Sequence, residues 1–237
     1  MSVLAHTTWP EVPSDGLVVV PVGSIEQHGP HLPFDTDTVI ATAVARGVVD
    51  RLGAGMLAPA LCYGSSGEHQ AFRGTASIGT EVLGMVVLEL VRSLRTWCER
   101  VVLVNAHGGN IAALAATVRQ LRAEGHDVAW VACATEVVDL HAGRTETSLM
   151  LHLDPARVRL DRAEAGDCRP IAELLPALIA GGVAAVSPNG VLGDPAGASA
   201  AEGVAVLGAM VDEICALVTD GHPDADGRLR EPAAAVR

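Results

Sequence analysis

The sequence contains no lysine, and all sixteen basic residues among its 237 positions are arginines. Schiff-base catalysis, pyridoxal phosphate enzymes and P-loop NTPases all need a lysine amine, so these classes are excluded. The formal net charge is −12, and the arginines form no basic cluster. This charge balance argues against nucleic acid and against an anionic membrane surface as partners.

Closely spaced cysteines and long apolar runs are missing as well. The five cysteines include no C-x-x-C pair, which excludes a zinc ribbon and a thioredoxin-type motif, and we expect buried thiols instead. No uncharged apolar run reaches the roughly 18 residues of a membrane span. The first residues carry neither the basic nor the apolar region of a signal peptide. We therefore expect a soluble, cytoplasmic protein.

Strand-like and helix-like segments alternate along the chain. This alternation predicts an α/β fold in which a mainly parallel sheet is covered by helices on both faces. We expect one domain over residues 1–220, followed by a disordered tail over 221–237. The predicted strands cover 16–23, 56–64 and 127–135, and a further strand runs into a glycine-rich loop over 100–110. The predicted helices cover 38–53, 80–98, 111–125, 145–153, 171–182 and 197–220.

Metal-binding residue types gather in the stretch "GSIEQHGPHLPFDTDT", whose prolines and glycines exclude regular helix or strand. Glu26 and His28 are two positions apart, and Asp37 follows nine positions later. Histidine and carboxylate without thiolate suit Zn, Mn or Fe(II), and a shared carboxylate can bridge two ions. The alternative is an ordinary polar loop that caps neighbouring helices. His31 and Asp35 are assigned supporting roles.

Three further loops carry similar residues, each after a predicted strand. "NAHGGN" holds His107, "HAGRTETS" holds His141 and Glu146, and "GEHQAFRGT" holds Glu68 and His69 with a weaker claim. Each loop taken alone is equally compatible with a glycine-rich turn or a helix cap. The carboxyl ends of parallel strands meet at one edge of a sheet, so we expect the loops to converge there.

Other catalytic patterns are absent. The sequence has no H-E-x-x-H, no G-x-S-x-G, and no G-x-G-x-x-G after a strand. A thiol nucleophile would need Cys133 or Cys62 beside a histidine, and this alternative stays open.

Taken together, these four motifs resemble the creatininase family of metal-dependent amidohydrolases. The resemblance implies an α/β fold, one or two divalent metal ions per subunit, hydrolysis of amide C–N bonds and a homo-oligomer. It also implies metal contacts from Glu26, His28 and His107, with Asp37 as the bridging carboxylate.

The chain departs from creatininase itself at two neighbouring positions. Gly109 stands where creatininase has a glutamate for its second ion, and Gly108 stands where it has an aromatic residue. Glu146 is our candidate for the missing ligand, as in the deformylase-like members of the family. The two glycines disfavour a creatinine pocket.

Much of the remaining chain resembles a subgroup of this family that matures a peptide-derived redox cofactor. The resemblance implies a peptidyl-dipeptidase that removes the modified C-terminal Val-Tyr unit from a precursor peptide. We expect His141 to donate a proton to the leaving nitrogen, and Glu146 to act as ligand or base. Arg144 and Arg73 are candidates for pairing with the terminal carboxylate of the peptide.

Two alternatives remain beside this hypothesis. The first is a small-molecule amidohydrolase that acts on creatinine or a formamidopyrimidine. The second is a non-catalytic metal-binding scaffold, which would contain metal without turnover.

Overall fold

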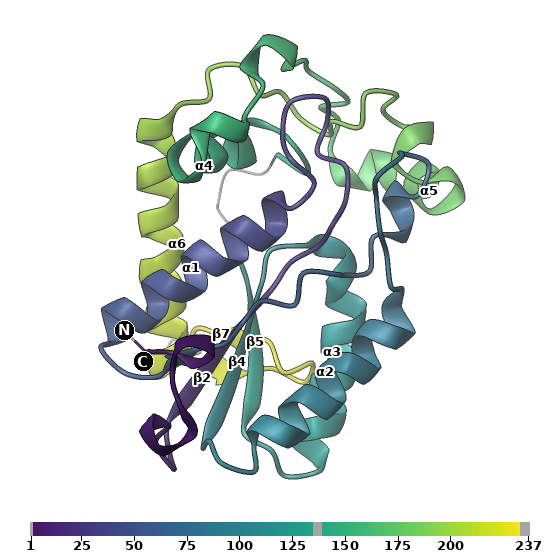
Figure 1. Cartoon of the computed structure of the whole chain (residues 1–237). Helices are drawn as coiled ribbons and strands as arrows, with labels where there is room; N and C mark the ends of the chain where they lie inside the picture. Colours follow the sequence, from purple (N-terminus) through teal and green to yellow (C-terminus); the bar gives the residue numbers. More distant parts are fainter. Residues whose placement is uncertain (1, 135–138, 233–237) are drawn as a thin grey trace, which may run out of the picture.

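A five-stranded parallel sheet forms the centre of the molecule (Figure 1). The computed structural model describes residues 2–134 and 139–232. Helices cover both faces of the sheet, so the predicted α/β architecture is confirmed. In the order of the sheet, the strands are β1 (Ser2–Val3), β3 (Met56–Leu57), β2 (Leu17–Val22), β4 (Arg100–Asn105) and β5 (Val128–Ala132).

The central strands are buried on both faces, which explains their unbroken apolar sequences. In β4, Val102 and Val104 point into the core on one side of the sheet. Val101 and Leu103 point into the core on the other side. Because side chains alternate along a strand, one run of valine and leucine supplies both cores.

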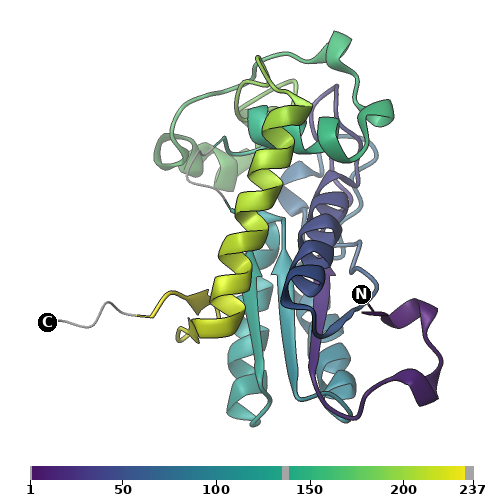
Figure 2. The same ribbon diagram turned by 90° about the vertical axis from the view of Figure 1, so that its left-hand side faces the viewer.

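Two pairs of helices enclose the sheet. The helices α1 and α6 cover one face, with α4 packed against α6, and α2 and α3 cover the other. Figure 2 shows α6 running beside α1 along the height of the molecule. The bounds are α1 Thr36–Leu52, α2 Thr80–Leu94, α3 Ile111–Ala123, α4 Arg144–Leu153, α5 Ile171–Gly181 and α6 Ala200–Asp220.

Short 3-10 turns occupy much of the connecting chain. Two of them, Gly67–His69 and Gly108–Asn110, lie in loops that the sequence marks as functional. The others are Leu4–His6, Trp9–Glu11, Pro155–Arg157, Leu160–Arg162 and Val183–Ala185.

The chain changes direction across the sheet between β2 and β4. From β2 it passes through α1 to β3 on one side, and then through α2 to β4 on the other side of β2. In open α/β sheets, a ligand crevice forms beyond the carboxyl ends of the strands at such a switch point. The loops after β2 and β4 carry Glu26 and His107, so the fold brings these two residues to that crevice.

Two predicted segments differ from the structure. The predicted strand 56–64 contains only Met56–Leu57, with one isolated bridge between Val22 and Leu61. The expected disordered tail instead forms a hairpin of β6 (His222–Pro223) and β7 (Leu229–Arg230).

This hairpin is ordered because it packs on β5. The Leu229 side chain is only 2% exposed, and the Trp130 indole donates a hydrogen bond to the Asp226 carbonyl at 2.9 Å. The part of the expected tail over 233–237 lies outside the described residues. Among the described helices, none is both long and apolar enough to cross a membrane.

Candidate metal centre

The loop after β2 reaches the centre of the site because it lies directly against α1. A Cβ atom on Gly23 would lie 2.5 Å from the backbone nitrogen of Thr38, so only glycine fits there. Helix α1 begins at Thr36, within the stretch expected to be irregular throughout. Asp37 therefore projects from the first helical turn, toward Glu26 and His28 of the loop.

Asp37 lies between two histidines, with one carboxylate oxygen near each. Its Oδ1 atom is 3.2 Å from His28 Nε2, and its Oδ2 atom is 3.5 Å from His107 Nδ1. The Ser24 hydroxyl donates a hydrogen bond to Oδ2 at 2.6 Å. This is the arrangement that a bridging carboxylate requires.

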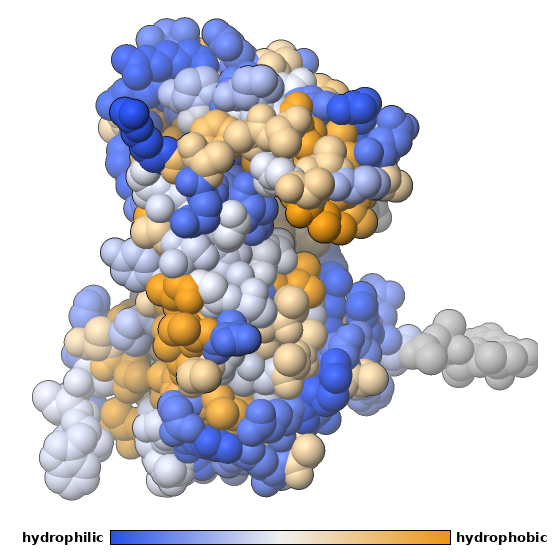
Figure 3. Space-filling view, turned by 90° about the vertical axis from the view of Figure 1, so that its right-hand side faces the viewer, coloured by the Kyte–Doolittle hydropathy of each residue, from blue (hydrophilic) through white to orange (hydrophobic). Residues whose placement is uncertain are grey.

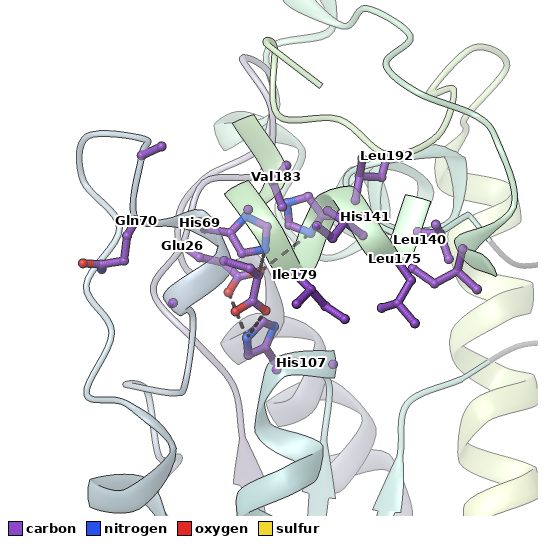
Figure 4. Close-up of a pocket in the computed structure, with 18 of the residues that line it drawn as sticks. Glu26, His69, Gln70, His107, Leu140, His141, Leu175, Ile179, Val183 and Leu192 are labelled. Atoms are coloured by element: carbon purple, nitrogen blue, oxygen red, sulfur yellow. Dashed lines mark ion pairs between the residues drawn. The ribbon is translucent and has the colours of Figure 1, made fainter. Parts of the chain in front are cut away.

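Glu26 is the most enclosed carboxylate of the site, with no exposed surface. Its Oε2 atom lies 3.1 Å from His107 Nε2, and its Oε1 atom lies 3.3 Å from His69 Nε2. His141 Nδ1 lies 3.7 Å from the same Oε1 atom. Figure 4 shows the three rings arranged around this carboxylate.

Glu146 completes the group from the first turn of α4. Its Oε2 atom accepts a hydrogen bond from the Ala142 backbone at 2.6 Å and lies 3.9 Å from His28 Nε2. The structure thus brings all six predicted ligand and catalytic side chains into one cluster. These are Glu26, His28, Asp37, His107, His141 and Glu146.

Gln27 orients two of the histidines. Its side-chain amide nitrogen lies 2.9 Å from His69 Nδ1 and 3.1 Å from His141 Nε2, and it also donates to the Gly190 carbonyl. The amide can donate to His69 Nδ1, which leaves the proton of His69 on Nε2, 3.3 Å from Glu26 Oε1 but without the geometry of a hydrogen bond. His141 Nε2 lies 2.7 Å from the backbone carbonyl of Gln27 and donates to it, so its approach to the Gln27 amide nitrogen, which is also a donor, is not a hydrogen bond. The unprotonated Nδ1 of His141 therefore faces the site.

Burial and neighbouring charges shift the pKa values in opposite directions. Burial, together with the negative charge of Asp37, raises the pKa of Glu26 to about 7. Burial also raises the pKa of Glu146 to about 7, with Asp37 contributing and His28 opposing. Burial acts to lower the pKa of His28, but the carboxylates of Asp37, Glu146 and Glu26 together raise it to about 10.

The pKa values of His141, His69 and Asp37 are all lowered. Burial lowers the pKa of His141 well below its usual value, and the charge of His28 adds to this effect. Burial and the charge of His107 lower the pKa of His69 to about 3. Burial works to raise the pKa of Asp37, but His28 and His107 hold it below its usual range. Groups with raised and lowered pKa values thus lie side by side, which is typical of functional sites.

The donor set fits a divalent metal ion. Within the described part of the chain, both carboxylate oxygens of Glu26 are buried and have no hydrogen-bond partner. A buried carboxylate without a donor is unfavourable unless a cation satisfies it. Three groups of ligand atoms lie within 4.8 Å of one another: Glu26, His69 and His141; His28, His141 and Glu146; and Glu26, His28 and Asp37. Nitrogen and oxygen donors of this kind suit Zn, Mn or Fe(II).

The cluster lies at one wall of a cavity of about 820 Å³. Gly108 and Gly109, which the sequence suggested as substrate-binding positions, both line this cavity. A Cβ atom on Gly109 would lie 2.6 Å from Glu68 Oε1 and 2.5 Å from His107 Nε2. The Ser65 backbone carbonyl, His107 and Glu68 therefore fill the space that a side chain at position 109 would need.

The two predicted carboxylate-binding arginines lie elsewhere. Arg144 pairs with Glu202 of α6 at 2.9 Å, and neither Arg144 nor Arg73 lines the cavity. Cys62 is exposed rather than buried as expected, and it does not line the cavity, while Cys133 lacks the chemistry of a nucleophile. Burial and the nearby Asp37 raise the pKa of Cys133, whereas a catalytic thiol needs a lowered pKa.

Sequence reasoning undervalued His69 and missed Gln27 and helix α5. His69 was visible as part of "GEHQAFRGT", but its buried contact with Glu26 depends on the loop conformation. Nothing in the sequence marks Gln27, since its role depends on two rings 42 and 114 positions away. Helix α5 reads as an ordinary apolar helix, although several of its side chains line the cavity.

Known proteins share this sequence and this fold. Residues 5–218 match the model of the family described as "Creatininase: Creatinine amidohydrolase". A relative from Mycobacterium ulcerans (strain Agy99), named "Mycofactocin precursor peptide peptidase", is 52% identical over 231 residues, or 94% of this chain and 90% of the relative.

Two creatininase structures superimpose closely, one titled "Creatininase Mn" and the other a mutant creatininase of "Zn-Zn type". Each has a TM-score of 0.75 and 28% sequence identity, covering 91% of this chain and 96% of the other.

Proposed function

Because the chain belongs to the creatininase family, we propose that it is a metal-dependent hydrolase that cleaves an amide bond of the mycofactocin precursor peptide. The bond that we propose releases the modified C-terminal Val-Tyr unit. The observation that carries the proposal is the buried Glu26, which faces three histidine rings at the wall of a large cavity. The 52% identical relative supports the same substrate.

Glu26, His28, Asp37 and His107 would hold the metal, with Glu146 as a further ligand. When bound, a divalent ion lowers the pKa of a coordinated water and polarises the scissile carbonyl. Asp37 can serve two ions because one of its oxygens faces His28 and the other faces His107. Zn, Mn and Fe(II) are all compatible with these donors, and one or two ions would be bound per subunit.

His141 and Glu146 would move the protons of the reaction. Nδ1 of His141 faces the cluster without a proton, since Nε2 donates to the Gln27 carbonyl. It can accept a proton as hydrolysis begins and donate it to the leaving nitrogen. Glu146 has a pKa of about 7, so it can exchange a proton near neutral pH if it does not ligate the metal.

The cavity favours a peptide over a small cyclic amide. Its volume of about 820 Å³ lies in the upper part of the range that is typical of sites for drug-sized ligands. Gly108 adds no side-chain bulk to this cavity, and nothing lies within 4 Å of its Cβ position. A non-catalytic scaffold is disfavoured as well, because a structural site does not need open access to a cavity.

We further propose a single catalytic domain that extends beyond the predicted end at residue 220 to include the hairpin of β6 and β7, together with a cytoplasmic location and a homo-oligomer. The family match over residues 5–218 supports the domain. The acidic net charge supports the absence of nucleic acid and membrane partners.

The test of the function is the reaction itself. We expect protein loaded with Zn, Mn or Fe(II) to release the two-residue unit from the modified precursor, as seen by mass spectrometry. Chelator treatment should abolish turnover, and restoring the metal should recover it, while creatinine should remain intact. An uncleaved precursor together with rapid creatinine opening would contradict the proposal and favour a small-molecule amidohydrolase.

A further inference from the structure

Helix α5 exposes a row of large apolar side chains. Ile171, Leu175 and Ile179 are four positions apart, so they lie along one side of the helix. Their exposed fractions are 45%, 48% and 78%. Leu174 is only 1% exposed and anchors the helix to Val183 instead. Hereafter, Ile171, Leu175 and Ile179 are called the α5 row.

The α5 row lines the same cavity as the metal centre. Figure 4 shows Leu175 and Ile179 to one side of the group formed by Glu26 and His107, with Leu140 beyond them. Figure 3 shows apolar side chains at the edge of a hollow in the upper half of the molecule, the half that carries α5. The cavity thus has one polar, acidic wall and one apolar wall.

Among the described residues that line this cavity, none carries a permanent positive charge. None of the described residues that line it is an arginine, and the chain has no lysine. Arg144 is paired with Glu202 outside the lining. Apart from the metal centre, the apolar wall is therefore the surface of the cavity to which we look for ligand binding.

We propose that the α5 row is the subsite that binds the apolar and aromatic side chains of the C-terminal unit that the enzyme releases. This inference rests on the proposed function, and it names the surface of the enzyme that selects the substrate. The α5 row shares its cavity with the metal centre. When an amide is held at Glu26 and His107, the neighbouring side chains of the substrate therefore lie against α5. An aromatic side chain buries about 150–250 Å², which suits an open apolar wall.

One double variant tests this subsite, and one single variant serves as its control. Leu175→Gln combined with Ile179→Gln removes the apolar surface from exposed positions. Val204→Gln is the matched control, since Val204 is a 53% exposed apolar residue of α6 outside the cavity. Unfolding midpoints of all proteins are measured first, and the single Ile179→Gln variant replaces the double one if that variant is unstable.

Binding is measured by calorimetry on zinc-loaded protein with two probes, Val-Tyr amide and Gly-Gly amide. We expect the unmodified protein to prefer Val-Tyr amide, and the double variant to bind it about 10–100-fold more weakly. Gly-Gly amide should bind all proteins alike, and Val204→Gln should behave as the unmodified protein. Equal affinity of the unmodified protein for both probes, or an unchanged preference in the double variant, would overturn the proposal.

Kinetics on the modified precursor separate this inference from the proposed function. We expect the double variant to raise KM more than it lowers kcat, since the α5 row contacts a part of the substrate that does not react. Failure of the unmodified protein to cleave the precursor would contradict the proposed function. The calorimetric preference would still decide whether the α5 row is a binding surface.

Discussion

Glu26 illustrates how single residues define this site. Its side chain has no exposed surface, yet both oxygens lack a hydrogen-bond partner in the described part of the chain. Burial and the charge of Asp37 raise its pKa to about 7, so its anionic form needs a compensating positive charge. A divalent ion held beside His28 and His107 would supply that charge.

Replacing His141 with alanine should separate proton transfer from metal binding. We expect His141→Ala to retain the metal while kcat falls by about 10²–10⁴-fold, because the metal centre keeps its other donors. Elemental analysis and steady-state kinetics on the same preparation measure both effects. Loss of the metal from this variant would show that His141 is a ligand. His126→Ala is the control, since His126 lies outside the cavity and its ring pairs with Glu124.

Some residues of the site can be identified from residue type and spacing alone. Glu26, His28 and Asp37 were predictable because they lie within one short, turn-rich stretch. Gln27 was not, because its hydrogen bonds reach rings that are distant in sequence. Arg144 looked available, but Glu202 lies 58 positions further along the chain and pairs with it.

At the scale of elements, α4 and α6 approach each other closely. A Cβ atom on Gly203 of α6 would lie 2.6 Å from the backbone carbonyl carbon of Ser148 on α4. The Ser148 hydroxyl also donates to Glu202 at 2.8 Å and accepts from the Ser199 backbone at 3.0 Å. This contact fixes α4, which carries Glu146, against the longest helix of the described chain.

Gly203→Ala should therefore destabilise the fold, although alanine usually favours a helix. The added methyl group meets backbone atoms, so α6 must shift, and we expect a loss of about 1–3 kcal/mol. Gly208→Ala is the matched control in the same helix, because nothing lies within 4 Å of its Cβ position. That variant should gain about 0.5–1 kcal/mol. Urea unfolding measures both, and equal effects would contradict the close contact.

The elements that the sequence predicted well have strong internal patterns. The run from Leu17 to Val22 and the helix α3 were recognisable from apolar spacing and from the turn residues that follow them. The hairpin of β6 and β7 was missed because its order depends on contacts with Trp130, some 96 positions away. Polar composition alone suggested disorder there.

For the whole molecule, the acidic charge and the buried histidines link metal binding to pH. The carboxylates around His28 raise its pKa to about 10 against the effect of burial, and burial raises that of Glu26 to about 7. Near neutral pH, His28 is therefore largely protonated and Glu26 partly so. Both must lose their protons before they can bind a metal ion, so binding releases protons.

Metal affinity should consequently rise as the pH increases from 6 to 8. Each proton released on binding strengthens the apparent affinity by up to about tenfold per pH unit. Titration of chelator-stripped protein with Zn²⁺ against a competing chelator, at several pH values, measures this slope. The increase in unfolding temperature on adding Zn²⁺ should also be larger at pH 8 than at pH 6, because it grows as Kd falls. Glu124→Gln, on the surface, should leave the slope unchanged, and an affinity independent of pH would show that the buried cluster does not bind the ion.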